Sequence, residues 1–272
     1  MLKIACNEKI DSNQSMSKKI QWGILGTGRI ARAFAEGVRN AKNAKLHAIG
    51  SRTKESAEMF AHEWKIPLPC CSYQELAENK SVDAIYIATP HTEHVSNTLL
   101  CLENGKGVLC EKPIAVNAHQ VELMIQKSKE KNVLLMEGMW SRFPPLMEKV
   151  RDILENKEIG EVRTIQADFG FRPENIDPVG RLFNPDLAGG SLLDVGIYPI
   201  SLSFMINGTP DSFVTECTKG RTGVDEQASM IFKYPNGSMA LLHSSIQADT
   251  RQEAFISGTE GSIRIHKQCW KP

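Results

Sequence analysis

The sequence has no excess of charge of either sign. Its 272 residues include 32 Lys and Arg and 32 Asp and Glu, so the formal net charge is zero with neutral histidines. Proteins that bind nucleic acid usually carry a basic patch or stripe, because phosphate contacts dominate their affinity. We therefore expect no nucleic-acid partner.

Cysteine is present, but in no pattern that a metal site or a disulfide framework requires. The seven cysteines are an odd number, Cys70 and Cys71 are direct neighbours, and no pair has the C-x-x-C spacing. Reduced thiols in the cytosol are the simplest interpretation of such a set. We predict a cytoplasmic protein without a metal site.

Long apolar runs are also lacking. Lys3, Glu8 and Asp11 interrupt the first nineteen residues, which do not resemble a signal peptide. The uncharged stretch 195–210 contains two prolines and is shorter than the roughly 20 residues that a membrane span needs. We expect no membrane association, and we interpret residues 1–18 as a flexible N-terminal arm.

From residue 20 to about 136 the pattern alternates strand and helix. Expected strands are 20–25, 46–51, 82–88, 107–110 and 133–136, with helices over 30–38, 55–64, 94–104 and 118–131 between them. Apolar strands alternating with helices predict a parallel sheet covered on both faces. We assign residues 19–138 to a doubly wound α/β domain.

The pattern then changes. After a helix at 145–155, strands predominate at 162–171, 212–219, 228–234, 238–247, 253–257 and 262–266, and one helix over 191–205 interrupts them. Turn signals such as Pro235-Asn236-Gly237 separate the strands. We assign residues 139–272 to an α+β domain on a mostly antiparallel open sheet.

A glycine motif follows the first expected strand. Gly26-Thr27-Gly28-Arg29-Ile30-Ala31 has the form G-x-G-x-x-A and opens a helix. Gly26 permits the tight turn, Gly28 lets the backbone approach a pyrophosphate, and the helix N-terminus supplies free N–H donors. This motif indicates that residues 19–138 form a Rossmann domain that binds NAD(P). The alternative is a glycine-rich structural turn.

The residues after the second strand favour NADP over NAD. NAD-binding versions usually place an acidic residue there to hold the ribose 2′-hydroxyl. Here the strand is followed by Ser51-Arg52-Thr53, and Arg52 offers a planar fork suited to a phosphate. NAD remains the alternative if Arg52 is only a solvated loop residue.

Two further segments indicate chemistry. Glu111-Lys112-Pro113 follows the strand 107–110, and ligands bind beyond the carboxyl ends of parallel strands. Asp194 and Tyr198 are spaced i, i+4 in the helix 191–205 and would share one face. Taken alone, the first segment is more often a turn, and the second pair could be a helix-internal hydrogen bonder and a core residue.

The order of these motifs resembles the Gfo/Idh/MocA family, which includes glucose-fructose oxidoreductase and inositol dehydrogenase. G-x-G-x-x-A comes first, then Thr89-Pro90 with His94, then Glu-Lys-Pro, then Gly-Gly-x-x-x-Asp-x-Gly-x-Tyr ending at Tyr198. The segments 72–76, 108–113, 136–143 and 269–270 are most similar to the dihydrodiol dehydrogenase and D-xylose dehydrogenase branch, which uses NADP.

The resemblance implies an oxidoreductase that transfers a hydride between the nicotinamide and a secondary or hemiacetal hydroxyl of a sugar, polyol or trans-diol. It implies that Lys112 and Tyr198 work at the reacting carbon and that Asp194 positions or polarises the substrate. An ammonium beside the phenol should lower the pKa of Tyr198 and make it a base. The family's pocket lies between its domains, where we expect Lys112 and Tyr198 to meet, and its open sheet often mediates homodimers.

The remaining site predictions fall into two groups. Residues expected to contact the cofactor are Gly26, Thr27, Gly28, Arg29, Ile30, Ser51, Arg52, Thr89, Pro90, His91, His94, Glu111, Lys112 and Arg142. Residues expected to wall an aromatic-tolerant substrate pocket are Trp140, Phe169 and Trp270, although such side chains are more often core. His94 could equally be structural, and Arg142 could pair with an acidic neighbour.

The sequence ends soon after Cys269-Trp270, where family members usually continue for several tens of residues. We therefore expect a truncated product or an incomplete reading of the gene. The alternative function is a non-catalytic or inactive nucleotide-binding protein of the same fold, which would have no need of Lys112, Asp194 and Tyr198 together.

Overall fold

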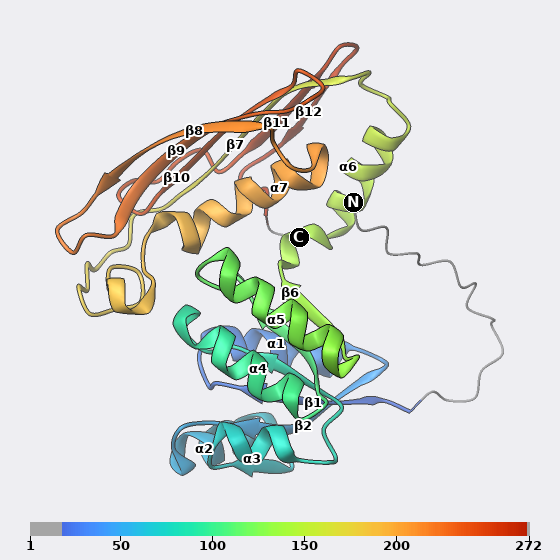
Figure 1. Cartoon of the computed structure of the whole chain (residues 1–272), viewed down its shortest axis with the longest axis vertical. Coiled ribbons are helices and arrows are strands. Elements are labelled where there is room, and N and C mark those ends of the chain that lie inside the picture. Colours follow the sequence, from blue (N-terminus) through green and yellow to red (C-terminus); the bar gives the residue numbers. More distant parts are fainter. Residues whose placement is uncertain (1–17, 271–272) are drawn as a thin grey trace. The chain divides into compact units, whose positions relative to one another are not determined.

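The computed structural model describes residues 18–270 and contains a six-stranded sheet in the order β3-β2-β1-β4-β5-β6. Figure 1 labels β1, β2 and β6 among its strands. The strands are β1 (Ile20–Leu25), β2 (Ala44–Gly50), β3 (Leu68–Cys70), β4 (Ala84–Ile87), β5 (Gly107–Glu111) and β6 (Leu135–Gly138). The pairs β1–β2, β2–β3 and β5–β6 run parallel, which confirms the predicted Rossmann-type sheet.

The helices between these strands follow the predicted alternation. They are α1 (Arg29–Asn40), α2 (Lys54–Trp64), α3 (Tyr73–Glu78), α4 (His94–Glu103) and α5 (Ala118–Lys131). Apolar side chains of the central strands, including Ile24, Leu25 and Ile49, are fully buried. Continuous burial along the strands is the expected property of a parallel sheet covered by helices.

One strand and one helix were missed by the sequence prediction. β3 has three residues with a proline in the middle, a pattern that argues against a strand unless it lies at a sheet edge. α3 has six residues and is capped by Ser72, whose side chain accepts a hydrogen bond from the amide of Glu75. The segment predicted as the third strand is therefore the fourth, β4, and Glu111-Lys112-Pro113 follows the fifth.

The second sheet has six strands in the order β12-β11-β7-β10-β9-β8. They are β7 (Val162–Gly170), β8 (Ser212–Lys219), β9 (Asp225–Lys233), β10 (Met239–Ser245), β11 (Ala254–Gly258) and β12 (Ser262–Ile265). β7 and β10 pair in parallel, and the other pairs are antiparallel. The prediction of a mostly antiparallel sheet is confirmed.

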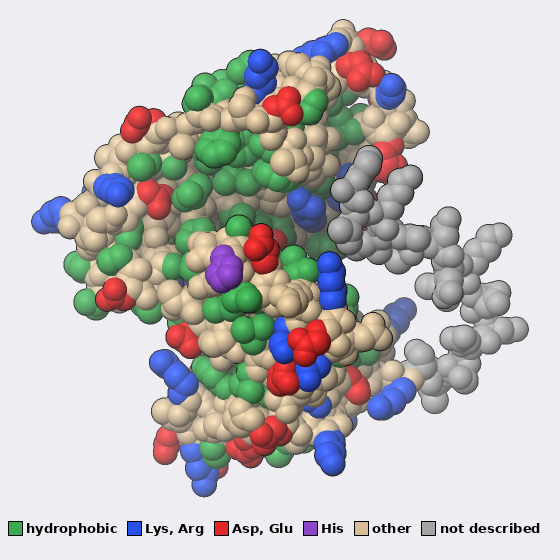
Figure 2. Space-filling model, in the orientation of Figure 1, with side chains coloured by type: hydrophobic (Ala, Val, Ile, Leu, Met, Phe, Trp, Pro, Cys, Tyr) green, Lys and Arg blue, Asp and Glu red, His purple; other side chains and the backbone are tan. Residues whose placement is uncertain are grey.

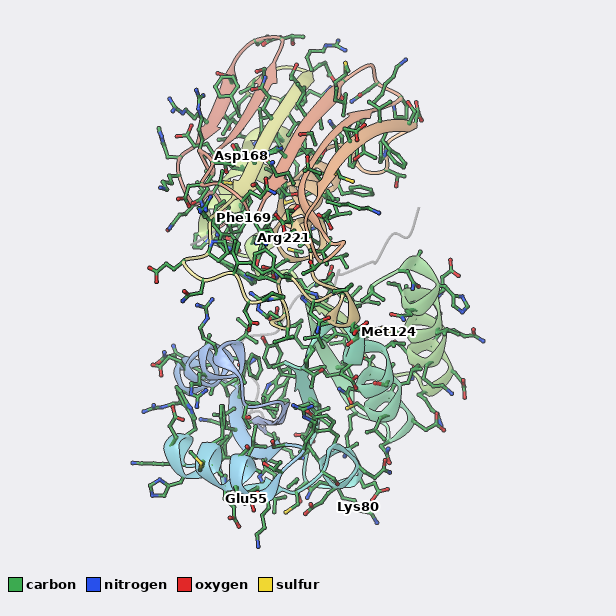
Figure 3. All side chains as sticks on the ribbon, turned by 90° about the vertical axis from the view of Figure 1, so that its left-hand side faces the viewer. Glu55, Lys80, Met124, Asp168, Phe169 and Arg221 are labelled. Atoms are coloured by element: carbon green, nitrogen blue, oxygen red, sulfur yellow. The ribbon has the colours of Figure 1, made fainter. Side chains whose placement is uncertain are left out.

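Two helices accompany this sheet, α6 (Pro145–Glu155) and α7 (Ile197–Asn207). α7 lies along one face of the sheet in Figure 1, and its Leu202 is buried in one cluster with Ile165, Met230 and Leu242. Successive side chains of a strand point to opposite faces, so Phe169 faces this core while its neighbour Asp168 does not. Figure 3 labels both residues on β7.

The helix predicted over 191–205 is present, but its beginning is not α-helical. Leu192–Gly196 forms a π-helical turn, and α7 starts only at Ile197. π-turns inside helices are frequent at functional sites. Asp194 lies in this turn and Tyr198 lies in the first turn of α7, so their predicted i, i+4 relation within one α-helix is corrected.

The described chain divides into two compact units, one ending at Tyr86 and the other beginning at Ile87. The last strand of the parallel sheet ends at Gly138, and the second sheet begins at Val162. The predicted domain boundary between residues 138 and 139 stays a prediction. The predicted N-terminal arm, apart from Lys18, lies outside the described residues.

One segment, Pro185–Asn207, is long and apolar enough to cross a membrane by length and composition, and half of its most apolar window is buried inside the protein. A buried core helix passes the same test, so this is weak evidence for a span. On the face that Figure 2 shows, Lys and Arg side chains are interspersed with Asp and Glu, consistent with the zero net charge.

Candidate active site and dinucleotide loop

The glycine loop has the geometry of a phosphate cradle. Gly26 adopts a φ of 100°, which favours glycine, and its amide donates to Gly50 O. Gly28 is exposed and caps α1 without a side-chain hydrogen bond, and a Cβ built on it meets nothing within 4 Å. The fold itself therefore does not require glycine at Gly28, whereas a dinucleotide approaching the open N-terminus of α1 would.

The residues that follow β2 can bind a phosphate, and the residues at the start of α1 leave the glycine loop exposed to solvent. Ser51 is buried, and Arg52 is exposed and has no hydrogen bond or ion pair with residues 18–270. Thr53 is engaged in capping α2, where its hydroxyl accepts from the amide of Ser56 at 3.3 Å. Arg29 and Ile30 are exposed at the start of α1. A free guanidinium of this kind can hold a 2′-phosphate.

The segment after β4 carries two imidazoles, the partly buried His91 and the fully buried His94. His94 Nδ1 lies 2.8 Å from Pro113 O and its Nε2 lies 3.0 Å from Thr89 O. Burial lowers the pKa of His94, and the contacts with the two carbonyls oppose that effect. His94 thus ties the end of β4 to the loop that carries Lys112.

His91 begins a short 3-10 turn, His91–Glu93, directly after Pro90. Its Nδ1 lies 3.4 Å from Ala188 O. Burial, and next the positive charge of Lys112, lower the pKa of His91 to about 4, so this imidazole is neutral at pH 7.

The Glu111-Lys112-Pro113 loop is held by carboxylates. The Lys112 amide donates to Glu111 Oε2 at 3.2 Å, and the Ile114 amide donates to Glu137 Oε1 at 2.9 Å. The Lys112–Pro113 peptide bond is cis. Glu137 was not among the predicted site residues. The feature of the sequence that could have indicated it is its position directly after the apolar start of β6.

Lys112 is brought to Asp194 and Tyr198, as the motif order predicted. Its Nζ donates to the Asp194 main-chain O at 2.6 Å and contacts Asp194 Oδ1 at 3.3 Å. The same Nζ lies 5.1 Å from the centroid of the Tyr198 ring. The Lys112 and Asp194 side chains are only 12% and 8% exposed, so this is a largely desolvated ion pair against an aromatic face.

The electrostatics at Tyr198 differ from the prediction. Burial raises the pKa of Tyr198, and the hydroxyl accepts a hydrogen bond from Trp140 Nε1 at 3.0 Å. The predicted lowering by an adjacent ammonium is wrong in this structure, because Lys112 lies over the ring and gives its hydrogen bonds to Asp194. Tyr198 is therefore protonated at neutral pH.

Asp194 is ionised despite its burial. Desolvation opposes its charge, but Lys112 and then Arg181 outweigh that effect, and the pKa of Asp194 lies below its ordinary value. Arg181 NH1 and NH2 lie 2.7 and 3.4 Å from Oδ1 and Oδ2. Arg181 was missed by the sequence analysis, since the loop 171–190 has no periodic pattern that would point to it.

A second missed residue, Asp225 on β9, caps the helix that carries Asp194 and Tyr198. Its Oδ2 accepts from the Leu192 amide at 2.7 Å and from Ser191 Oγ at 2.8 Å. Gly190 adopts a φ of 119°, and a Cβ there would meet Asp225 Oδ1 at 2.2 Å. The Gly189-Gly190 signal in the sequence is thus explained by the close approach of this capping carboxylate.

The three predicted aromatic residues gather around Tyr198. The Trp140 and Phe169 ring centroids lie 5.9 and 5.3 Å from that of Tyr198. Trp270 stacks on Phe169 with centroids 3.5 Å apart, and it is buried in the core.

Arg142, a predicted cofactor residue, directs its guanidinium to Ser201 on α7. Its Nε donates to Ser201 Oγ at 2.9 Å, and its NH2 donates to the Ser201 carbonyl at 3.1 Å.

Nothing in residues 18–270 resembles a metal centre, since no three His, Cys, Asp or Glu side chains converge there. These elements bring together a lysine, a carboxylate, a phenol and two imidazoles. Such a set can bind a hydroxyl or carbonyl oxygen and exchange a proton with it.

Comparisons with known proteins agree with this geometry. A model described as "Oxidoreductase family, NAD-binding Rossmann fold" matches residues 20–139, and the GFO/IDH/MocA C-terminal domain matches residues 147–264. Trans-1,2-dihydrobenzene-1,2-diol dehydrogenase of Xenopus tropicalis is 40% identical over 256 residues, covering 93% of this chain and 77% of the relative. The human enzyme of that name is 34% identical over 257 residues, covering 93% and 76%.

Two similar solved structures share the whole described architecture. A 3-ketoreductase from Actinomadura kijaniata in complex with NADP and TDP-benzene has a TM-score of 0.85 and 27% identity, covering 94% of this chain and 78% of that one. An aldose-aldose oxidoreductase from Caulobacter crescentus complexed with glycerol has a TM-score of 0.85 and 28% identity, covering 92% and 77%. With both family models matched along most of its length, this chain belongs to the Gfo/Idh/MocA family of oxidoreductases.

Proposed function

We propose that this oxidoreductase uses NADP and acts on a secondary or hemiacetal hydroxyl of a sugar, polyol or trans-diol. The observation that carries the proposal is the Lys112 ammonium, held by Asp194 at 2.6 Å and lying over the ring of Tyr198. The relatives named trans-1,2-dihydrobenzene-1,2-diol dehydrogenase and the aldose-aldose oxidoreductase support this substrate class.

The residues present fit a dinucleotide. Gly28 leaves open space at the uncapped N-terminus of α1, and Arg52 is free to meet a 2′-phosphate. Thr89, Pro90, His91, His94 and Glu111 follow or end the strands β4 and β5, where a parallel sheet binds its ligands. The nicotinamide would supply or accept the hydride.

The proton is handled by this chain's own side chains. Lys112 Nζ gives two hydrogen bonds to Asp194, and its third N–H can bind the substrate oxygen. Because the pKa of Tyr198 is raised by burial, its hydroxyl is a general acid that donates to a carbonyl oxygen. In the opposite direction the substrate hydroxyl returns that proton to the phenolate, so oxidation is favoured at higher pH.

The aromatic residues around Tyr198 supply the apolar side of the pocket. Trp140 fixes the Tyr198 hydroxyl by donating to it at 3.0 Å, and Phe169 packs against the ring. A ring or carbon skeleton with adjacent hydroxyls fits such a wall, because one face is apolar and the other polar.

A homodimer through the second sheet is part of the proposal. Ile231, Leu241 and Phe255 are exposed on its outer face, and Leu241 is paired with Ile231 in the register of β9 and β10. Sedimentation of Leu241→Lys should show loss of a dimer, whereas Leu134→Lys at an exposed site outside this sheet should not. A monomeric wild-type chain would refute the assembly.

The cytoplasmic location also remains a proposal. The six cysteines within the described residues are all free, which supports a reducing compartment.

Activity is tested by NADPH absorbance on the purified chain with a panel of aldoses, polyols, trans-diols and inositols. The proposal predicts turnover of at least one aldose or trans-diol, with NADP preferred to NAD. Absence of turnover on every panel member, in a folded chain that binds NADP, would contradict it.

A further inference from the structure

Asp194 is held by two cations rather than one. Arg181 NH1 lies 2.7 Å from Oδ1, and Arg181 NH2 lies 3.4 Å from Oδ2, so two guanidinium nitrogens meet two carboxylate oxygens. Lys112 Nζ reaches the same Oδ1 at the longer distance of 3.3 Å. The paired geometry of an arginine and a carboxylate fixes orientation as well as distance.

Arg181 differs from the other members of this cluster in its exposure. Its side chain is 58% exposed, whereas those of Asp194 and Lys112 are 8% and 12% exposed. The guanidinium therefore covers the buried ion pair from the solvent side, where a small molecule added to the solution can reach its place.

The backbone around Arg181 is anchored on both sides. Gly180 N donates to Asp177 O, and the carbonyl of Leu182 accepts from Gly190 N at 2.8 Å. Phe183 is buried together with Val195 and Ile246. A loop held in this way presents the guanidinium to Asp194 at low cost in conformational entropy.

We propose that Arg181 is a positioning residue of the active site: it holds the Asp194 carboxylate so that Lys112 keeps one N–H directed to the substrate. Without Arg181, the carboxylate would be free to turn, and Oδ2, which Arg181 NH2 now holds at 3.4 Å, could take that N–H. This inference rests on the proposed roles of Lys112 and Asp194.

The charges facing Asp194 make the proposal sensitive to pH. Lys112 from the loop after β5, Arg181 from the loop after β7, His91 from its 3-10 turn and Tyr198 from α7 all face this carboxylate or its neighbours, and Glu111 acts on Tyr198. Arg181 is one of the two cations that lower the pKa of Asp194. Removing it should move the acidic limb of the kcat/KM profile to higher pH.

The test compares Arg181→Ala with Arg172→Ala, an exposed arginine of the same loop whose guanidinium donates to the Gln247 carbonyl at 3.4 Å. The reaction is NADP reduction with D-xylose and with trans-cyclohexane-1,2-diol. Arg181→Ala should lower kcat about tenfold to hundredfold, the range expected when a catalytic group is displaced, with the KM for NADP unchanged. Arg172→Ala should behave as the wild type.

Chemical rescue separates a positioning role from a structural one. Guanidinium ion at a non-denaturing concentration should restore part of the kcat of Arg181→Ala and return its pH profile toward that of the wild type. Arg181→Lys keeps the charge but offers no fork, so it should recover less than the arginine. An unchanged kcat and pH profile in Arg181→Ala, or a loss that guanidinium does not reverse, would overturn the proposal.

Lys112→Met is assayed in parallel to keep the two proposals apart. If Lys112→Met is as active as the wild type, the proposed function fails. If Lys112→Met is inactive while Arg181→Ala is unaffected, only the inference about Arg181 fails.

Discussion

The glycine loop and the Lys112 site differ in how they are built. The loop is a contiguous stretch in which a strand, a turn and a helix follow one another, and its Gly28 is open to solvent. The Lys112 site is buried and is assembled from the loop after β5, the loop after β7, a π-turn and α7. A motif that is contiguous in sequence fixes its own geometry. A site built from segments that are far apart in sequence depends instead on how those segments pack and on buried charges that neutralise one another.

The largest expected effect concerns the buried site. Lys112→Met keeps the length of the side chain and removes the ammonium, so kcat/KM should fall by about 10²–10⁴, the range of general acid–base catalysis. Binding of NADP, measured by calorimetry, should persist.

The control for this change is Lys127→Met, which removes an ammonium that pairs with Glu103 and Glu130 on the surface of α5. It should leave kcat/KM unchanged. Equal activity of the two variants would mean that Lys112 has no part in the reaction.

The next effect concerns the exposed loop. Gly28→Val places a side chain where the pyrophosphate must approach and should abolish measurable NADP binding. The protein should still fold, because a Cβ at Gly28 meets nothing within 4 Å and its φ is −74°.

Gly37→Val is the matched control on the same helix, since a Cβ there also meets nothing within 4 Å. It should bind NADP as the wild type does. Unaltered affinity in a folded Gly28→Val protein would remove the dinucleotide assignment of the loop.

A third effect concerns stability and arises from the buried imidazole of His91. Its pKa is lowered to about 4, so between pH 6.5 and 4 the unfolded chain binds a proton that the folded protein does not. The free energy of unfolding should therefore fall as pH is lowered through this window, by at most about 3 kcal/mol from His91, at roughly 1.4 kcal/mol per pKa unit.

Urea unfolding at pH 7 and pH 5 measures this dependence. In His91→Gln, the free energy of unfolding should decrease less between pH 7 and pH 5. Part of the decrease should remain, because the pKa of His94 is also lowered. His119→Gln on the exposed face of α5 serves as the control. A His91→Gln protein with the same pH dependence as the wild type would argue against a desolvated His91.

The smallest expected effect concerns cofactor choice. Arg52→Ala should raise the dissociation constant of NADP by about tenfold, since a charge-assisted hydrogen bond contributes ~1.5–3 kcal/mol. NAD binding should barely change. Lys80→Ala removes another exposed cation of the same unit, labelled in Figure 3, and should affect neither cofactor. Equal losses for NADP and NAD in Arg52→Ala would exclude a 2′-phosphate contact.

Most of the fold could be predicted because its elements carry local signals. The strands Ile20–Leu25 and Ser212–Lys219 and the helix Ala118–Lys131 have the predicted bounds. β3 escaped because three residues around Pro69 carry no strand pattern. The π-turn at Leu192–Gly196 escaped because apolar spacing does not distinguish it from an α-helix.

The sequence predicted that Lys112, Asp194 and Tyr198 would lie together, but it gave the wrong direction for the pKa of Tyr198. Ordered motifs identified Lys112, Asp194 and Tyr198, which the structure brings together. Burial and the direction of a hydrogen bond decide the pKa of Tyr198, and neither can be known before the chain is folded. Arg181 could not be found for the same reason, since its contact with Asp194 depends on the path of an irregular loop.

The central claim is that Lys112 and Tyr198 act as one unit on the substrate oxygen. Its most direct test is a double-mutant cycle of kcat with Lys112→Met, Tyr198→Phe and the combined variant, measured with NADPH absorbance. Because residues acting as a unit are non-additive, the account predicts that the double variant loses little more activity than the more damaged single variant. A double variant whose loss equals the product of the two single losses would show that the residues act independently and would contradict the account.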